Sequence, residues 1–153
     1  RVPLSLSDES DGTRTWLRLI AGALDALEAG AVLLIDEIDA SLHPRLTARL
    51  IGLFRDERTN GQGAQLIFTT HDATLLGTSF GAEILGRDEV WFIEKGTDGG
   101  TRLFSLSEFR PRKGENTERR YLGGSYGAVP AVFSDTLVEQ LLTASREPSS
   151  AEA

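Results

Sequence analysis

The feature that most constrains the fold is the apolar run at residues 31–35, which stops at two adjacent carboxylates, Asp36 and Glu37. A short run of Val, Leu and Ile is typical of a strand buried on both faces of a parallel sheet. Two acids directly after such a strand have no packing rationale. They mark either the start of a solvated loop or a functional site at the strand end, and these residues alone favour neither.

Two segments with helical spacing flank this strand. Residues 13–30 predict an amphipathic helix that ends at Gly30, a natural helix stop, and a second helix is expected from Pro44 to about Arg58. Residues 64–70 predict a second buried strand after a polar, glycine-containing loop. The apolar positions that the first helix should align on one face are Trp16, Ile20, Ala23, Leu24 and Leu27.

Strands that alternate with helices predict an α/β fold with a parallel sheet flanked by helices. In such sheets, ligands bind beyond the carboxyl ends of the strands. Asp36 and Glu37 end one strand, while His71 and Asp72 end the next. We therefore expect two polar clusters at the same edge of the sheet, where chemistry would take place.

Smaller elements are expected in the rest of the chain. After a short helical stretch at residues 73–76, two apolar segments flank a glycine-rich turn at 96–100, which is typical of a β-hairpin. A charged, partly helical segment follows at 114–124. Residues 134–147 predict a last helix with Ser134 as its N-cap.

Length and composition exclude several classes of protein. The 153 residues suit a single domain, expected over 1–145, followed by a small polar tail at 146–153 that we expect to be disordered. No apolar run approaches the 18 or so residues that span a bilayer. The absence of cysteine excludes disulfides and thiolate metal sites, and with no signal peptide we expect a cytoplasmic protein.

The charge distribution bears on the partners of the chain. A formal net charge of −7 argues against a protein whose whole surface follows nucleic-acid phosphates. The basic segment at residues 109–120 leaves nucleic acid open as a partner through a local patch, although a solvated surface element is the more ordinary interpretation.

A strand that ends in Asp-Glu suits nucleotide hydrolysis. The first carboxylate, Asp36, can hold the Mg²⁺ that bridges nucleotide phosphates, and Glu37 can orient or deprotonate the attacking water. A neutral imidazole at the end of the neighbouring strand, His71, can reach a γ-phosphate oxygen. The ordinary alternative for His71 is a surface histidine without a chemical role.

A possible anion site precedes the first helix. Ser10, Asp11, Gly12 and Thr13 lead directly into it, and hydroxyls with unpaired backbone N–H groups at a helix N-terminus bind phosphate well. A plain N-cap with a turn before it is the structural alternative, and these four residues alone favour it.

The order of these motifs is more specific than any one of them. Ser-x-Gly opening a helix, a strand ending in Asp-Glu, "DASLHP", and a strand ending in "TTHD" resemble the second half of an ABC-type ATPase domain, from about Leu6 to Asp72. The resemblance is to the non-transporter branch with its SMC-like proteins, and above all to AAA15/AAA21-type ATPases of phage-defence and OLD-like systems. Their C-terminal portion often carries a charged helix and a pattern like that of residues 119–130.

The resemblance implies a P-loop NTPase-like fold and a role for each motif. Asp36 would be the Walker B ligand of Mg²⁺, Glu37 the catalytic base, and His71 the switch histidine. Residues from Asp39 to His43 would be the D-loop at a dimer interface.

The signature motif would act across that dimer. Ser10 and Gly12 would contact the γ-phosphate of ATP bound to the opposite protomer, with Thr13 as a neighbouring polar contact. Two positions depart from the pattern common in transporters, because Glu9 replaces leucine in the signature and His43 replaces aspartate in the D-loop. Both departures favour the non-transporter branch.

One motif of such ATPases is missing from the sequence. No G-x-x-x-x-G-K-[ST] loop, which would bind the β- and γ-phosphates, occurs in these residues, and there is no methionine. We expect this chain to be the C-terminal half of an ATPase whose missing half, or a partner, supplies that loop. By itself the chain would be inactive.

Three functions are consistent with these observations. The leading one is a parent protein that binds and hydrolyses ATP as a nucleotide-sandwich dimer, in phage defence or DNA maintenance. The first alternative is a non-catalytic, ATPase-like interaction domain. The second, an AAA+ motor, is disfavoured because the Ser-x-Gly helix start lies upstream of Walker B, because Asn is more usual than His71, and because no arginine finger is identifiable.

Overall fold

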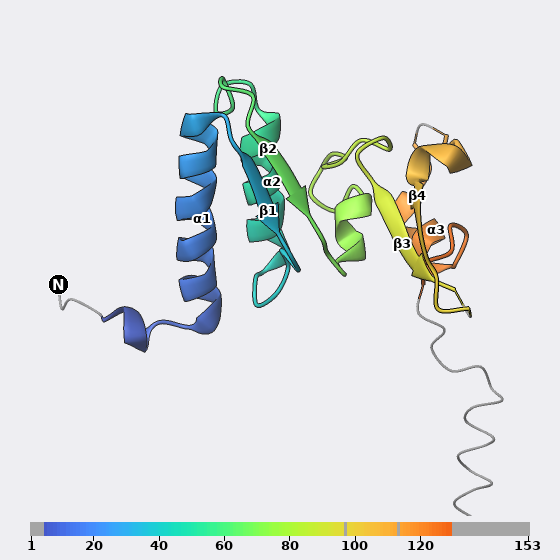
Figure 1. Ribbon diagram of the computed structural model, residues 1–153, viewed down its shortest axis with the longest axis horizontal. Helices are drawn as coiled ribbons and strands as arrows, with labels where there is room; N and C mark the ends of the chain where they lie inside the picture. The colour runs from blue at the N-terminus through green and yellow to red at the C-terminus, as the bar shows by residue number, and fades with distance from the viewer. Residues whose placement is uncertain (1–4, 97, 113, 130–153) are drawn as a thin grey trace, which may run out of the picture.

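The computed structural model describes residues 5–96, 98–112 and 114–129, which form a mixed α/β structure (Figure 1). The helix expected at residues 134–147 with its N-cap Ser134, and the tail at 146–153, lie outside these residues. The elements in chain order are η1 (Leu6–Asp8), α1 (Asp11–Ala29), β1 (Val32–Ile35), α2 (Pro44–Arg55), β2 (Gln65–Phe68), η2 (Ala73–Leu76), β3 (Trp91–Lys95), β4 (Thr101–Ser105), η3 (Leu106–Phe109) and α3 (Thr117–Leu122).

Helix α1 confirms the predicted first helix and begins two positions earlier than expected. Ser10 is its N-cap, and the Ser10 hydroxyl accepts the backbone N–H of Thr13. The helix ends at Gly30, whose left-handed φ of 63° suits glycine. A Cβ atom at Gly30 would lie 2.7 Å from the carbonyl oxygen of Gln62, so the loop before β2 also requires the absence of a side chain there.

Strands β1 and β2 form the predicted parallel pair. Their register aligns Val32 with Gln65 and Ile35 with Phe68, so the carboxyl ends of both strands lie side by side. One face of this pair packs on α1 and α2, which lie beside and behind it in Figure 1. The cluster between them has its fully buried centre at Ala23, Ile38, Leu50, Ile51 and Leu75, and it includes the strand residues Leu33, Ile35, Leu66 and Phe68.

The other face of the sheet corrects the prediction of strands buried on both sides. Val32, Leu34 and Ile67 point away from the helices, and their exposed fractions are 56%, 70% and 57%. Both strands alternate between exposed and half-buried positions because no element among the described residues covers this face. Leu24, expected in the apolar stripe of α1, is likewise 56% exposed.

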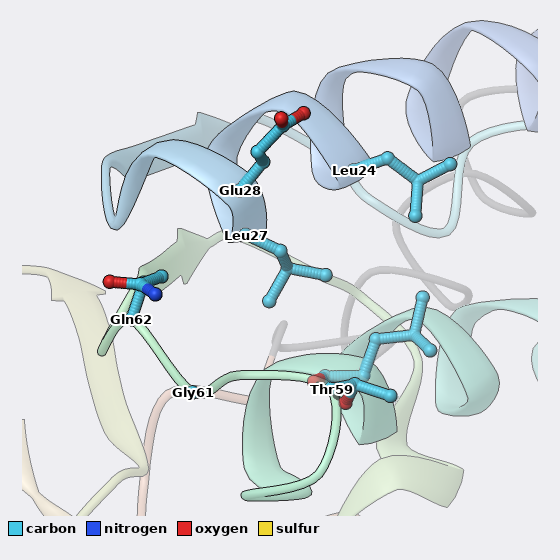
Figure 2. Close-up of a pocket in the computed structure, with 7 residues that line it drawn as sticks. Leu24, Leu27, Glu28, Thr59, Gly61 and Gln62 are labelled. Atoms are coloured by element: carbon cyan, nitrogen blue, oxygen red, sulfur yellow. Dashed lines mark hydrogen bonds between the residues drawn. The ribbon is translucent and has the colours of Figure 1, made fainter.

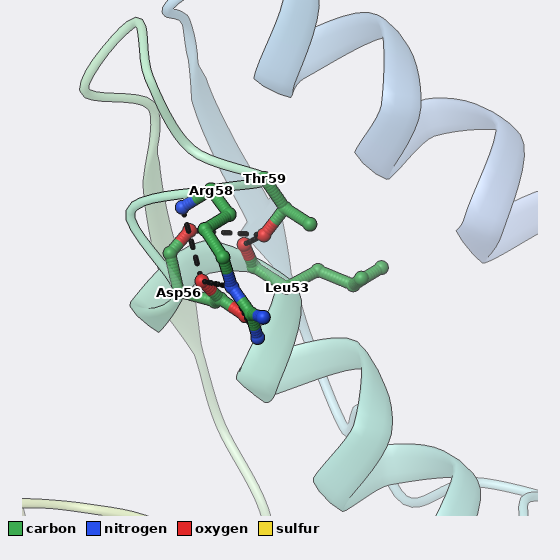
Figure 3. Close-up of polar contacts among 4 residues, drawn as sticks. All are labelled: Leu53, Asp56, Arg58 and Thr59. Atoms are coloured by element: carbon green, nitrogen blue, oxygen red, sulfur yellow. Dashed lines mark hydrogen bonds and ion pairs between the residues drawn. The ribbon is translucent and has the colours of Figure 1, made fainter.

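Helix α2 is three residues shorter than predicted because a tight turn follows Arg55 (Figure 3). The carboxylate of Asp56 accepts the guanidinium and the backbone N–H of Arg58. These bonds lower the pKa of Asp56 from 3.8 to about 2, with the side-chain bond contributing most. The hydroxyl of Thr59 donates to the carbonyl oxygens of Leu53 and Asp56, which closes the turn over the end of the helix.

The predicted hairpin is confirmed, with β3 and β4 antiparallel around a glycine-rich turn. Its inner face builds a second, aromatic cluster in which the ring of Phe92 stacks on Tyr121 and Tyr126 at centroid distances of 5.4 and 5.8 Å. The buried members of this cluster are Val90, Phe92, Phe104, Leu106 and Tyr126.

The short helix η2 connects the two clusters. Leu75 is 1% exposed and belongs to the first cluster, whereas Leu76 packs against the second. Helix α3 packs against η2, and a Cβ atom at Gly77 would lie 3.3 Å from Cβ of Glu118. Glycine at position 77 therefore permits the close approach of α3 to the segment that follows β2.

Candidate functional site

The carboxyl ends of β1 and β2 bring the two predicted polar clusters to one edge of the sheet. The hydroxyl of Thr69, just after β2, donates to Oδ1 of Asp36, just after β1. The same hydroxyl accepts the backbone N–H of Glu37 at 2.8 Å. One residue further, the backbone N–H of Ile38 donates to the carbonyl oxygen of Thr69 at 3.0 Å. The two strand ends are thus connected by both side-chain and main-chain bonds.

A second set of hydrogen bonds connects the next residues of each segment. Oδ1 of Asp39 accepts the hydroxyl of Thr70 at 2.6 Å and the backbone N–H of His71 at 3.3 Å. The hydroxyl of Thr70 in turn accepts the backbone N–H of Asp72 at 3.0 Å. Asp39 therefore fixes the main chain at the point where the His71 side chain leaves it.

Glu37 and His71 face each other across this edge. Nε2 of His71 lies 3.8 Å from Oε1 of Glu37, and both side chains are exposed, at 86% and 61%. Water and a ligand can therefore reach both groups. At this separation a water molecule can contact both side chains, and a carboxylate and an imidazole are each able to accept a proton from it.

The N-terminus of α1 is ordered by its own side chains. The hydroxyl of Ser10 accepts the N–H of Thr13 at 3.1 Å, and the two hydroxyls lie 2.9 Å apart. A Cβ atom at Gly12 would lie 2.8 Å from the carbonyl oxygen of Ser41, so the first turn of α1 rests directly on the loop between β1 and α2. Ser10 and Thr13 form the N-cap that was the structural alternative at this position. Their predicted contact with a γ-phosphate stays a prediction.

His43, the last residue of the predicted D-loop, has a local structural role. It is the N-cap of α2, and its Nδ1 accepts the backbone N–H of Arg45 at 3.2 Å. The bond fixes the imidazole at the start of the helix, with Pro44 in the first turn. The predicted role of His43 and Asp39 at a dimer interface stays a prediction.

The described residues contain no group of three or more His, Cys, Asp or Glu side chains arranged to hold a metal ion. Mg²⁺ in nucleotide sites is usually held by only one or two carboxylates, with substrate phosphates and waters completing its shell. Asp36, an exposed carboxylate at the end of a strand, fits that donor set. Asp36 is therefore suited to bind a magnesium ion that is also coordinated by the phosphates of a nucleotide.

A shallow pocket lies at the opposite end of the sheet and is separate from these residues. It is formed where the C-terminal turns of α1 and α2 approach the loop before β2, and Figure 2 shows the Leu27 and Thr59 side chains at it. The residues that line it are Leu24, Leu27, Glu28, Leu53, Thr59, Gly61 and Gln62. The amino ends of the strands therefore carry an apolar hollow, whereas the carboxyl ends carry the polar groups.

Sequence reasoning missed two side chains of this edge. Thr69 and Thr70 precede His71, yet only the histidine was given a role. Two hydroxyls in succession immediately after a buried strand were the available signal, since they stand where a loop should begin. Which carboxylate each one reaches depends on the register of β1 and β2, and spacing alone does not give that.

Comparison with known proteins supports the resemblance drawn from the motifs. The model of the family AAA_21, described as "AAA domain, putative AbiEii toxin, Type IV TA system", matches residues 1–77, half of the chain. The chain belongs to this AAA domain family. Membership implies a P-loop NTPase that binds nucleotide, and the match includes every residue from Ser10 to His71.

Other comparisons add no further relatives. No curated protein and no solved structure matches the chain. Within the part of the chain that the structure describes, none of the helices has the length and apolar character needed to cross a membrane.

Proposed function

We propose that this AAA domain contributes the acidic and switch residues of an ATP-hydrolysing site, which a phosphate-binding loop from another segment or subunit completes. The observation that carries the proposal is the edge of the sheet where Asp36, Glu37 and His71 meet, with Glu37 and His71 3.8 Å apart. Family membership implies that a nucleotide is bound, and the side chains at this edge are suited to its hydrolysis.

Each side chain has a distinct role in the proposal. Asp36 holds the Mg²⁺ that accompanies ATP, and the ion neutralises charge on the phosphates. Glu37 orients the attacking water and takes its proton, while His71 donates a hydrogen bond to the γ-phosphate oxygen. The exposure of the Glu37 and His71 side chains supports the assignment, because a nucleotide and water can reach them.

The second part of the proposal concerns the start of α1. Its first-turn N–H groups and the hydroxyls of Ser10 and Thr13 form an anion-binding end, which contacts the γ-phosphate of ATP held by an opposite protomer. The approach of Gly12 to Ser41 supports a connection between this end and the loop from Asp39 to His43, since both belong to one surface. ATP is then enclosed between two copies.

The phosphate-binding loop must come from outside these 153 residues, because the sequence contains no G-x-x-x-x-G-K-[ST] pattern. The uncovered face of the β1–β2 pair supports the proposal that another segment packs on this sheet. Val32, Leu34 and Ile67 present apolar side chains there, and parallel sheets are normally covered on both faces. The segment that supplies the loop would cover this face.

A role in phage defence rests on the family description alone, which names a putative AbiEii toxin and a Type IV TA system. In this role the ATPase would drive or restrain an attached effector by opening and closing its dimer.

The proposal is tested by Glu37→Gln in the complete gene product, together with the subunit that supplies the loop if that is a separate chain. We expect ATP to bind with an affinity within about threefold of the wild type, while turnover falls by about 10³-fold or more, because only the proton acceptor is removed. Glu57→Gln, the same change in an exposed side chain beyond α2, is the matched control and should keep full turnover. Turnover near the wild-type rate in Glu37→Gln would show that Glu37 is not the base.

A non-catalytic interaction domain is the second candidate. The observation that favours it is the engagement of Ser10, Thr13 and His43 in helix caps, which explains these residues without a nucleotide. This alternative predicts that wild type and Glu37→Gln show the same negligible turnover, even when the phosphate-binding loop is present.

A further inference from the structure

The backbone of Glu37 adopts an unfavourable conformation. Its φ is 51°, in the left-handed region that few residues other than glycine occupy. Holding a glutamate there costs free energy, and such strain persists only where the surroundings enforce it. The neighbouring residue Ile38 is 1% exposed, so the chain must turn sharply from an exposed carboxylate into the core.

Thr69 holds both peptide groups on either side of this strained residue. Its hydroxyl accepts the backbone N–H of Glu37 at 2.8 Å, and its carbonyl oxygen accepts the backbone N–H of Ile38 at 3.0 Å. The two consecutive N–H groups that follow β1 therefore both donate to Thr69, which follows β2. The left-handed turn at Glu37 is what allows both bonds to form together.

The third bond of Thr69 extends the arrangement to Asp36. A hydroxyl has one proton to donate, and here that proton goes to Oδ1 of Asp36 while an oxygen lone pair takes the Glu37 N–H. The donor and acceptor requirements are consistent, so one hydroxyl group fixes the carboxylate of Asp36 and the main chain of Glu37 at once. No other side chain among the described residues makes hydrogen bonds to both.

We propose that Thr69 is a positioning residue of the hydrolytic site, which holds Asp36 and Glu37 in the relative geometry that the reaction needs. This inference rests on the proposed function and adds a residue to which that function assigns nothing. Thr69 contacts neither nucleotide nor metal in this scheme. It acts through the Asp36 carboxylate and the Glu37 backbone, so its loss should affect the hydrolytic step more than the binding of ATP.

The first test measures the backbone directly and needs no turnover. Amide hydrogen exchange is followed for Glu37 and Ile38 in the complete protein, comparing Thr69→Val, which keeps the shape but loses the hydroxyl, with Thr69→Ser, which keeps the hydroxyl. We expect the Glu37 amide to exchange about tenfold faster in Thr69→Val and near the wild-type rate in Thr69→Ser. Unchanged exchange in Thr69→Val would overturn the inference.

Thr59→Val is the matched control for this comparison. It removes a threonine hydroxyl that also donates to main-chain carbonyls, in the turn after α2 and at the far end of the sheet (Figure 3). It should loosen that turn and leave the Glu37 amide unchanged. Faster exchange at Glu37 in Thr59→Val as well would mean that any lost hydroxyl loosens the domain, and it would overturn a specific role of Thr69.

The second test is kinetic. Thr69→Val should lower kcat for ATP hydrolysis about tenfold or more, with KM changed by no more than about twofold, and Thr69→Ser should restore most of the rate. The unfolding temperature of each variant is measured alongside, so that kcat is compared per folded protein. A wild-type kcat in Thr69→Val, with Glu37→Gln inactive, would overturn the inference while the proposed function stands.

If Glu37→Gln itself retains turnover, the proposed function fails, and the role of Thr69 in hydrolysis fails with it, while the exchange measurement still decides whether Thr69 holds the Glu37 backbone. Accelerated exchange confined to Thr69→Val would keep Thr69 as the residue that holds the Glu37 backbone, and unchanged exchange would remove it.

Discussion

Two consecutive threonines after β2 take different carboxylate partners, and this division decides how the candidate site is held. Thr69 donates to Asp36 and Thr70 donates to Asp39, so two hydroxyl–carboxylate bonds connect the same pair of segments. Neither partner is evident from the order of residues along the chain. The position of Asp36, Glu37 and His71 at one edge was predictable because parallel strands end at the same edge of a sheet, whereas the partner of a threonine depends on the register.

The roles of Ser10 and His43 illustrate the opposite limit at the residue scale. Both were assigned from a resemblance, and both make helix caps in the structure. For Ser10, a cap and a phosphate contact use the same feature, the N–H groups of a first turn, so sequence cannot separate them. Only a bound nucleotide would show which N–H groups change partner.

A pH prediction belongs to Asp56, whose pKa is lowered to about 2 by the Arg58 side chain and backbone N–H. Because the folded-state pKa lies below the ordinary value of 3.8, this bond stabilises the fold fully above about pH 5 and is lost as the pH falls toward about 1. We expect Asp56→Asn to flatten this part of the curve of unfolding temperature against pH. Asp25→Asn, the same change at an exposed carboxylate of α1, is the matched control, and an equal flattening in both variants would contradict a specific effect of the Arg58 bond.

At the scale of elements, the order helix, strand, helix, strand and hairpin was predictable, because apolar periodicity and glycine or proline at the ends fix each element locally. The end of α2 was not predicted correctly, because the helix ends at Arg55 and not at about Arg58. The Asp56–Arg58 turn stops the helix through a side-chain bond that a periodic pattern does not contain. The burial of the strands was not predictable either, because it depends on which other segments pack against the sheet.

A glycine pair on α1 tests the account of that helix. Gly30→Ala should destabilise the fold by about 1–2 kcal/mol, because φ is 63° and the new Cβ would approach the Gln62 carbonyl oxygen at 2.7 Å. Gly22→Ala, inside the helix and with no atom beyond the neighbouring helical backbone within 4 Å of the new Cβ, should stabilise it by about 0.5–1 kcal/mol. Denaturant unfolding of both variants measures the difference. Equal effects of the two changes would contradict the close approach at Gly30.

At the scale of the whole molecule, the described residues form two hydrophobic clusters connected through η2, and one sheet face has no cover. The fully buried centre of the first cluster lies within the part of the chain that matches the AAA domain family, and the buried residues of the second lie beyond it. Exposed Leu34 and Ile67 on a parallel sheet are the clearest indication that another segment packs here. Sequence could not reveal this, since the apolar letters of a covered and an uncovered strand are identical.

The central claim is that this domain completes an ATP site shared between two copies. The most direct measurement is sedimentation velocity of the complete Glu37→Gln protein, with its loop-bearing subunit if that is separate, in the presence of ATP and Mg²⁺. Because the variant is expected to bind ATP without hydrolysing it, the account predicts a stable dimer that dissociates when the Mg²⁺ is chelated, and that does not form when Ser10→Ala is added. A sedimentation coefficient that is the same with and without ATP would contradict the claim.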